Sequence, residues 1–136
     1  MVITTITILI AVGSLLLLVP RLFGIHSYIV LSGSMEPTIH VGALAFVNHK
    51  DCDVEVGDIV TFQIQENNDT LVTHRVISID EDGYHFKGDA NANEDMAVVS
   101  KSQIVGTYVF QIPEIGFFLD KLNTDKALAP YNFSLY

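Results

Sequence analysis

Residues 31–38 read LSGSMEPT and follow an apolar N-terminal segment after a short connector. Gly33 lacks a Cβ atom and Pro37 fixes its own φ, so this stretch favours a tight turn. Such a turn can expose the Ser34 hydroxyl while nearby backbone N–H groups point at an oxyanion. Ser and Gly are also common in ordinary solvated loops, so the turn alone does not establish a nucleophile. The sequence on either side has to decide between these two interpretations.

The segment before the turn contains no charged side chain from Met1 to Pro20. Residues 2–19 are mostly Ile, Val and Leu, and as a helix they would reach ~27 Å, close to the ~30 Å core of a bilayer. The alternatives are a buried helix and a cleaved secretory signal, which needs a basic start and a small-x-small site. No basic residue precedes Arg21, and residues 20–23 make a poor cleavage site. The segment is therefore predicted to be a membrane anchor, although one arginine does not fix its orientation.

The 136 residues suffice for one domain plus this anchor. The net charge is −9, and every charged residue follows position 20. This argues against a nucleic-acid partner and against electrostatic attachment to anionic lipid, so contact with a membrane should be apolar. The single cysteine, Cys52, lies between Asp51 and Asp53 and permits no intrachain disulfide. Its acidic neighbours disfavour a thiolate, so we interpret Cys52 as unreactive.

The chain after the anchor has the pattern of a mainly β domain with six to eight short strands. Asp82-Gly83 favours a two-residue hairpin turn, and Pro113 should end the last strand. Residues 23–26 are predicted to be a connector, 66–69 a turn, 88–95 a polar loop and 115–122 a short amphipathic helix. The expected strands are residues 28–31, 43–47, 58–65, 71–79, 84–87 and 103–112.

His74 lies in the expected strand 71–79, where alternation puts it on the same face as Val72 and Val76. A histidine in apolar company is either a satisfied core residue or a general base. A hydroxyl becomes a good nucleophile only when a neighbouring base takes its proton, and imidazole titrates near neutral pH. The competing histidines are His26, His40, His49 and His85.

Residues 87–95, KGDANANED, supply the carboxylates nearest to this strand. The spacing of Asp89, Asn91 and Asn93 is that of the start of a calcium-binding EF-hand loop. Glu94 stands where that loop needs Gly, and Ser100 where it needs Glu, so neither a metal nor another cofactor is predicted. A carboxylate here could instead hold an imidazole in its productive tautomer, or the segment could be a solvated loop.

These pieces, in this order, resemble type I signal peptidases over most of the chain, from the anchor to about residue 122. Histidine at position 74, where the bacterial housekeeping branch has lysine, resembles the endoplasmic-reticulum-like branch, which includes archaeal enzymes and some from Gram-positive bacteria. The matching motifs are SGSMEPT at 32–38, VGDIVTF at 56–62, THRV at 73–76, KGDxN at 87–91 with Asp95, VG at 105–106, and IPxIG at 112–116.

The resemblance implies a role for each matched residue. Ser34 corresponds to the nucleophile and His74 to the general base. Asp95 corresponds to the third member of the triad, Asp89 to a second required acid, and Ser32 to a hydroxyl that forms the oxyanion hole with the Ser34 N–H. The implied fold is a signal-peptidase-like β-barrel or mixed β fold with an N-terminal transmembrane helix. The implied substrates are secretory preproteins with small residues at the third and first positions before the cut.

We therefore expect an anchor at residues 1–21, a catalytic domain at 22–122 and a tail at 123–136. The expected location is the cell membrane, or the endoplasmic reticulum membrane in a eukaryote, with a single span and an extracytoplasmic catalytic domain. Expected partners are preproteins, the lipid bilayer and the subunits of a signal peptidase complex. Many relatives have a second span after the IPxIG segment, but here residues 117–119 are followed by Asp120-Lys121.

Two other functions remain open from the sequence. A catalytically inactive, membrane-anchored β-domain could bind preproteins or scaffold a complex, although retention of the serine, the histidine and both acids argues against it. A protease dedicated to a narrow set of substrates would use the same chemistry and differ only in what it cleaves.

Overall fold

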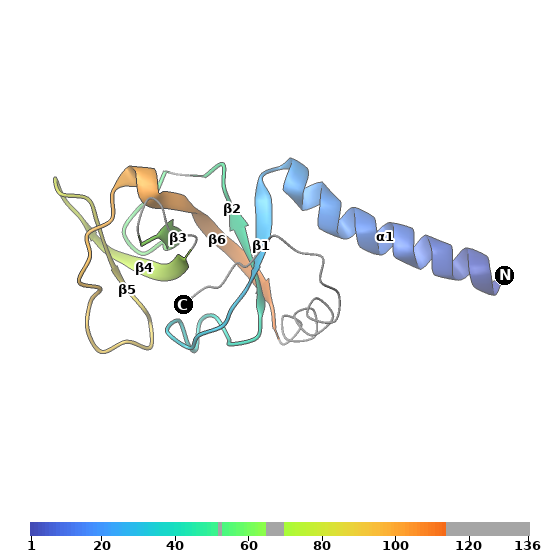
Figure 1. Cartoon of the computed structure of the whole chain (residues 1–136), viewed down its shortest axis with the longest axis horizontal. Coiled ribbons are helices and arrows are strands. Elements are labelled where there is room, and N and C mark those ends of the chain that lie inside the picture. The colour runs from blue at the N-terminus through green and yellow to red at the C-terminus, as the bar shows by residue number, and fades with distance from the viewer. Residues whose placement is uncertain (52, 65–69, 114–136) are drawn as a thin grey trace.

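The computed structural model describes residues 1–51, 53–64 and 70–113. A long helix, α1 (Val2–Leu22), is followed by a β domain (Figure 1). The remaining elements are β1 (Ile25–Ile29), β2 (Leu44–Asn48), β3 (Ile59–Gln63), β4 (Leu71–Ile79), β5 (Tyr84–Lys87), the 3₁₀ turn η1 (Lys101–Gln103) and β6 (Ile104–Ile112).

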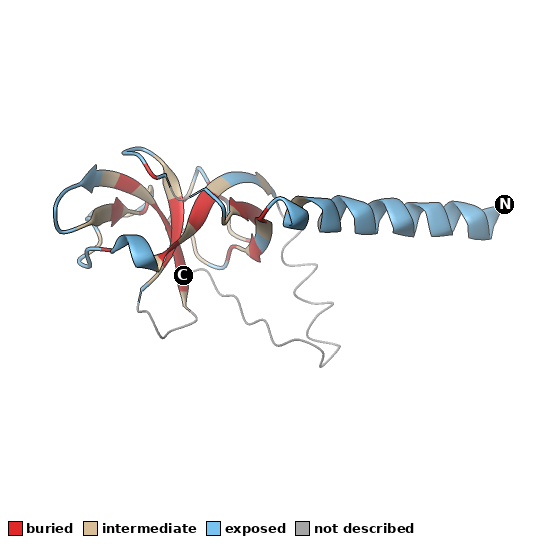
Figure 2. Ribbon diagram, turned by 90° about the horizontal axis from the view of Figure 1, so that it is seen from above, coloured by how far each residue is buried: buried red, intermediate tan, exposed pale blue. Residues whose placement is uncertain are grey.

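Helix α1 extends away from the sheet, and its side chains are almost all exposed (Figure 2). Its mean hydropathy is 2.7, and it is the one helix in the described chain that is long and apolar enough to cross a bilayer. The helix continues past Pro20 and ends at Leu22, one residue beyond the expected anchor. An exposed apolar helix of this length is stable when lipid covers it, because its backbone groups are bonded internally.

The strands form one antiparallel sheet in the order β1-β2-β6-β3-β4-β5. The predicted mainly β fold with an N-terminal helix is therefore confirmed. Strand β6, the last of the described strands in sequence, lies between β2 and β3 and joins the two halves of the sheet. Strand β5 pairs with β4 only from Arg75 onward, so residues 71–74 have β3 on one side and no described strand on the other.

The two faces of the sheet carry separate apolar clusters. Side chains alternate along β4, so Leu71 joins one cluster while Val72 and Val76 join the other. The first cluster comprises Tyr28, Val30, Met35, Ile39, Ala43, Ala45, Val47 and Leu71. The second comprises Val54, Val60, Phe62, Val72, Val76, Phe86, Val99 and Ile104. The same alternation directs Thr73 to the first face and His74 to the second.

Some predicted boundaries were wrong. The connector expected at 23–26 ends early, because β1 starts at Ile25 and pairs with β2. The hairpin expected to turn through two residues has a four-residue loop, since Ile79 pairs with Tyr84. In this loop the Asp80 carboxylate accepts the N–H groups of Asp82 and Gly83. Gln103 belongs to η1 rather than to β6. Cys52, the turn at 66–69, the helix at 115–122 and the tail lie outside the described residues.

Candidate active site

Residues 31–41, here called the serine turn, are held by bonds at both ends. The Val30 N–H donates to the Ala43 carbonyl (3.0 Å), and the Ile39 N–H donates to the Met35 carbonyl (2.9 Å). The Glu36 carboxylate accepts the Val41 N–H (3.0 Å), which closes the turn from inside. Side chains of Met35 and Ile39 are buried beneath it. The exposed part of the turn is therefore fixed by a buried part.

Gly33 is not required by the backbone conformation of the turn, because its φ is not positive. A Cβ built on Gly33 would be 3.5 Å from Glu36 Cγ, which is an ordinary contact. The critical glycine is Gly88, where a Cβ would stand 2.6 Å from the Ser34 carbonyl oxygen. That carbonyl also accepts the Ala90 N–H (2.9 Å), so the polar loop 88–95 lies directly against Ser34.

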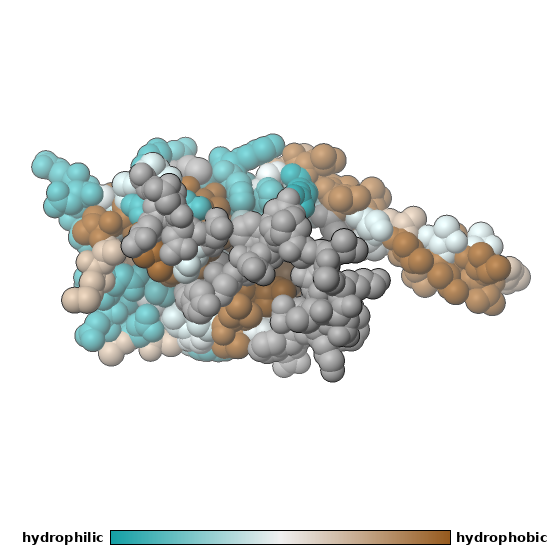
Figure 3. Space-filling model, viewed as in Figure 1, coloured by the Kyte–Doolittle hydropathy of each residue, from teal (hydrophilic) through white to brown (hydrophobic). Residues whose placement is uncertain are grey.

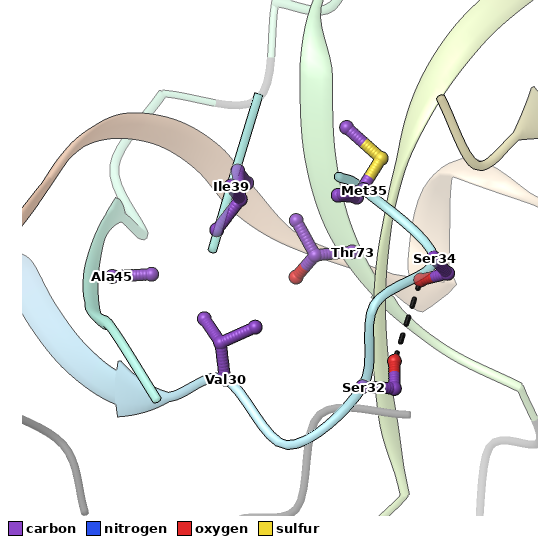
Figure 4. Close-up of a pocket in the computed structure, with 7 residues that line it drawn as sticks. All are labelled: Val30, Ser32, Ser34, Met35, Ile39, Ala45 and Thr73. Atoms are coloured by element: carbon purple, nitrogen blue, oxygen red, sulfur yellow. Dashed lines mark hydrogen bonds between the residues drawn. The ribbon is translucent and has the colours of Figure 1, made fainter. Parts of the chain in front are cut away.

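The two serine hydroxyls face each other at the surface of the turn. The Oγ atoms of Ser32 and Ser34 are 3.4 Å apart, and both residues are half-buried (Figure 4). A hydroxyl at this distance can donate to charge that develops on a group attacked by its neighbour.

His74 is buried and held by Asp95. Its exposed fraction is 7%, and its Nδ1 is 2.5 Å from Asp95 Oδ2. The Asp95 N–H donates to the Phe86 carbonyl (2.9 Å), which fixes the acid at the end of β5. The other ring nitrogen, Nε2, is buried and has no hydrogen-bond partner among the described residues. A buried polar atom without a partner is costly and commonly marks a functional site.

Ser34 lies beside the part of β4 that carries His74. Thr73, just before His74, lines the same hollow as Ser34. Arg75, just after it, is tied to the serine turn through Asp89, as described below. The structure thus brings the serine turn to the stretch of β4 that carries His74. No hydrogen bond joins Ser34 to His74 within the described chain.

Asp89 links the serine turn to strand β4. Its carboxylate accepts two bonds from Arg75, at 2.8 Å from Nε and 2.6 Å from Nη2, and a third from Thr38 Oγ1 at 2.6 Å. Arg75 lowers the pKa of Asp89, and Thr38 lowers it further. These bonds clamp the serine turn to β4. The sequence analysis gave Arg75 and Thr38 no role, although both lie within the quoted motifs.

A small, shallow hollow, open to solvent, lies beside Ser34 (Figure 4). Its surface is almost entirely apolar, and the Thr73 hydroxyl that belongs to the lining is bonded to the Thr61 hydroxyl (2.8 Å between oxygens). The lining comes from segments far apart in the sequence, which is why it was not predicted. The residues are Val30, Ser32, Ser34, Met35, Ile39, Ala45 and Thr73.

The other four histidines have different surroundings. His40 bonds the Glu36 carboxylate at the exposed side of the serine turn, and His85 bonds Asp80 on the hairpin. His26 and His49 stack on each other near the end of α1. Within the described residues, no group of three or more His, Cys, Asp or Glu side chains could hold a metal ion. His74 is therefore the best candidate for a base.

Comparison with known proteins matches residues 2–92 to the family model "Signal peptidase, peptidase S26". Signal peptidase I W of Bacillus subtilis is 41% identical over 101 residues, which cover 69% of this chain and 52% of that protein. The signal peptidase complex catalytic subunit SEC11 of Scheffersomyces stipitis is 36% identical over 101 residues, covering 65% of this chain and 60% of that protein. The chain thus spans between half and two thirds of the length of these relatives. The family match confirms the resemblance drawn from the motifs, and the chain belongs to the signal peptidase family, peptidase S26.

Proposed function

We propose that this chain is a membrane-bound serine endopeptidase that removes N-terminal signal peptides from secretory preproteins. The observation that carries the proposal is the His74 imidazole, which is fixed at Nδ1 by Asp95 and buried without a partner at Nε2. An imidazole held in this way is ready to take a proton at Nε2. The relatives of this chain are named as signal peptidases, and these names suggest the class of reaction.

In the proposed reaction, Ser34 Oγ attacks the scissile carbonyl while His74 Nε2 takes the hydroxyl proton. The Asp95 carboxylate keeps the imidazolium oriented and stabilises its charge. The tetrahedral intermediate collapses as its C–N bond breaks, and His74 returns the proton to the leaving amine. A water, deprotonated by His74, then attacks the acyl-serine ester, and Ser34 leaves with its proton restored. Apo enzymes often have long catalytic hydrogen bonds that shorten with substrate, which accommodates the missing Ser34–His74 bond.

The oxyanion of this intermediate would be bound by the Ser34 N–H and the Ser32 hydroxyl. Ser32 is supported in this role by the 3.4 Å separation of its Oγ from the attacking oxygen. One such donor is typically worth ~10²–10³ in turnover.

Small residues before the cut would occupy the hollow beside Ser34. An extended peptide places alternate side chains on one face, so its first and third residues before the cut point inward together. The unpaired edge of β4 at residues 71–74 can supply main-chain bonds to such a peptide. Val30, which directly follows β1, would supply part of the other wall of this groove, because its side chain lines the hollow.

We also propose that α1 anchors the enzyme, with residues 1–21 as the anchor and 22–122 as the catalytic domain outside the cytoplasm. The helix supports this by its length and hydropathy. Subunits of a signal peptidase complex are candidate partners because the SEC11 relatives are named as catalytic subunits of one.

The test is cleavage of a labelled preprotein by the detergent-solubilised chain, with product ends identified by mass spectrometry. Ser34→Ala should lower turnover on the order of 10⁶-fold, the loss expected for a triad nucleophile. The melting temperature should stay near that of the wild type, because Ser34 is a half-buried turn residue. Ser78→Ala, on the exposed end of β4, is the matched control and should cleave normally. An active Ser34→Ala enzyme would exclude Ser34 as the nucleophile, and an inactive wild type would favour the scaffold alternative.

A further inference from the structure

Cationic side chains gather where α1 meets the sheet. Arg21 lies in the last turn of α1, and Lys50 follows β2 but folds back onto the end of the helix. Lys50 Nζ donates to the Leu22 carbonyl (3.3 Å). The stem of Lys50 crosses Gly24, where a Cβ would stand 2.6 Å from Lys50 Cγ and where φ is +84°. Only a glycine at position 24 leaves room for this lysine against the helix end.

Two histidines complete this junction cluster, defined as Arg21, His26, His49 and Lys50. The rings of His26 and His49 stack with centroids 4.0 Å apart, and Tyr28 bonds His49 Nε2 at 2.6 Å. Burial and the charge of Arg21 lower the pKa of His26. Burial and the proximity of His26 lower the pKa of His49 to about 4. Burial is the main cause of both shifts, so the two rings stay neutral near neutral pH, and the positive charge of the cluster comes from Arg21 and Lys50.

Nearby carboxylates do not neutralise the two permanent cations. Asp51 follows Lys50, but its Oδ2 accepts the Thr107 hydroxyl on β6 (3.0 Å). Asp53 is exposed in the following loop. In the part of the chain that the structure describes, neither Arg21 nor Lys50 forms an ion pair, whereas Arg75 does. Among the described residues, Arg21 and Lys50 thus have no ionic partner at the C-terminal end of α1, although the net charge of the chain is −9.

The position of the junction cluster along α1 indicates which anion it would meet in a membrane. Twenty-one helical residues span roughly 31 Å, so placing residues 2–19 in the hydrocarbon core puts Arg21 just outside it, at the level of the lipid phosphates. Leu22 and Phe23 beside the cations are 77% and 67% exposed. They are suited to contact with acyl chains. Figure 3 shows the hydrophobic surface of α1 giving way to hydrophilic residues where it meets the sheet.

We propose that the junction cluster binds the phosphate of an anionic phospholipid in the leaflet around the C-terminal end of α1. Arg21 and Lys50 supply charge and N–H donors, and the histidine pair forms the wall on the sheet side. The proposal rests on the membrane anchoring proposed above. It changes the expectation that membrane contact is only apolar, because overall acidity does not describe the charge at this end of the molecule.

The test uses the full chain in nanodiscs that contain equal amounts of phosphatidylcholine and phosphatidylglycerol. Native mass spectrometry of the released protein gives the ratio of the two lipids retained. The wild type should retain phosphatidylglycerol preferentially. Arg21→Gln and Lys50→Gln should each reduce this preference by about fivefold, since one basic residue near an anionic surface is worth about 1 kcal/mol. Lys101→Gln, an exposed lysine of η1, is the matched control and should retain the preference.

No preference in the wild type, an unchanged preference in both junction variants, or an equal loss in Lys101→Gln would each overturn the proposal. Release of the bound lipid by millimolar inorganic phosphate would assign the cluster to soluble anions and also overturn it. If Lys50→Gln does not fold, Arg21→Gln decides, because Arg21 makes no described side-chain bond. Preprotein cleavage and resistance to carbonate extraction, measured on the same samples, report separately on the proposed activity and anchoring.

Discussion

Replacing Asp89 by Asn should destabilise the domain as well as inactivate it. The carboxylate accepts two bonds from Arg75 and one from Thr38. Asn keeps one acceptor oxygen but turns an N–H₂ group toward a guanidinium or a hydroxyl that has to donate. The variant therefore loses the ion pair and at least one charge-assisted bond, and the serine turn loses its link to β4.

The magnitude follows from the partial burial of this pair. The side chains of Arg75 and Asp89 are 34% and 17% exposed, which lies between a surface pair worth ~0–1 kcal/mol and a buried pair whose disruption costs ~3–5 kcal/mol. We expect a loss of about 2 kcal/mol, which lowers the melting temperature of a domain this size by roughly 10 °C. The pKa of Asp89 is lowered in the folded state, so its contribution is complete above the unfolded pKa of about 4. The contribution disappears as the pH falls through the lower folded-state pKa. The difference in unfolding free energy between wild type and variant should therefore be constant near neutral pH. It should disappear in strong acid.

The assay is thermal unfolding by circular dichroism, paired with preprotein cleavage, for Asp89→Asn, Asp95→Asn and the exposed control Glu81→Gln. Asp95→Asn should lower turnover on the order of 10⁴-fold with little change in melting temperature, because it disturbs the His74 tautomer rather than a clamp. Glu81→Gln removes a charge without a described contact and should alter neither property. If Asp89→Asn melts like the wild type yet is inactive, Asp89 acts in the chemistry and the clamp assignment is wrong.

Three further outcomes are expected. Gly88→Ala should impair cleavage, because its Cβ would stand 2.6 Å from the Ser34 carbonyl oxygen, whereas the nearest contact of a Cβ in Gly33→Ala is an ordinary 3.5 Å, so that variant should fold with an unchanged backbone. Equal cleavage rates for the two variants would contradict this expectation. Ala45→Leu should fill the hollow and shift the preferred residue at the first and third positions before the cut from Ala toward Gly, whereas the exposed control Ala97→Leu should not. The measurement is cleavage of preproteins that carry Gly, Ala, Val or Phe at those two positions, and efficient cleavage after Phe by the wild type would refute the small-residue pocket. His74→Lys should be inactive at neutral pH, because Asp95 would keep the lysine charged and unable to accept a proton. Near-normal turnover of this variant in a pH–rate series would show that the acid does not face this position.

Local pattern in the sequence was enough for the elements that depend on periodicity. Strand β4 has the predicted bounds of residues 71–79, because a stretch rich in Val, Ile and Thr and bounded by polar turn residues favours a strand over this range. The apolar helix was predicted because twenty uncharged, mostly aliphatic residues favour a helix that is long and apolar enough to cross a bilayer. Ser34, His74 and Asp95 were selected by motif, and the bond between His74 and Asp95 agrees with the pairing that the motif implied.

The tertiary structure alone decided what joins these pieces. Strand β6 enters between β2 and β3, and the hollow collects Val30, Ala45 and Thr73 from three strands or strand ends. Asp89 finds Thr38, 51 residues away, and Lys50 finds the end of α1, 28 residues away. Sequence patterns predict structure over stretches of a few residues, where periodicity and backbone preferences act. Contacts between distant segments are selected by burial of two apolar faces and by strand register, which are properties of the whole packed sheet.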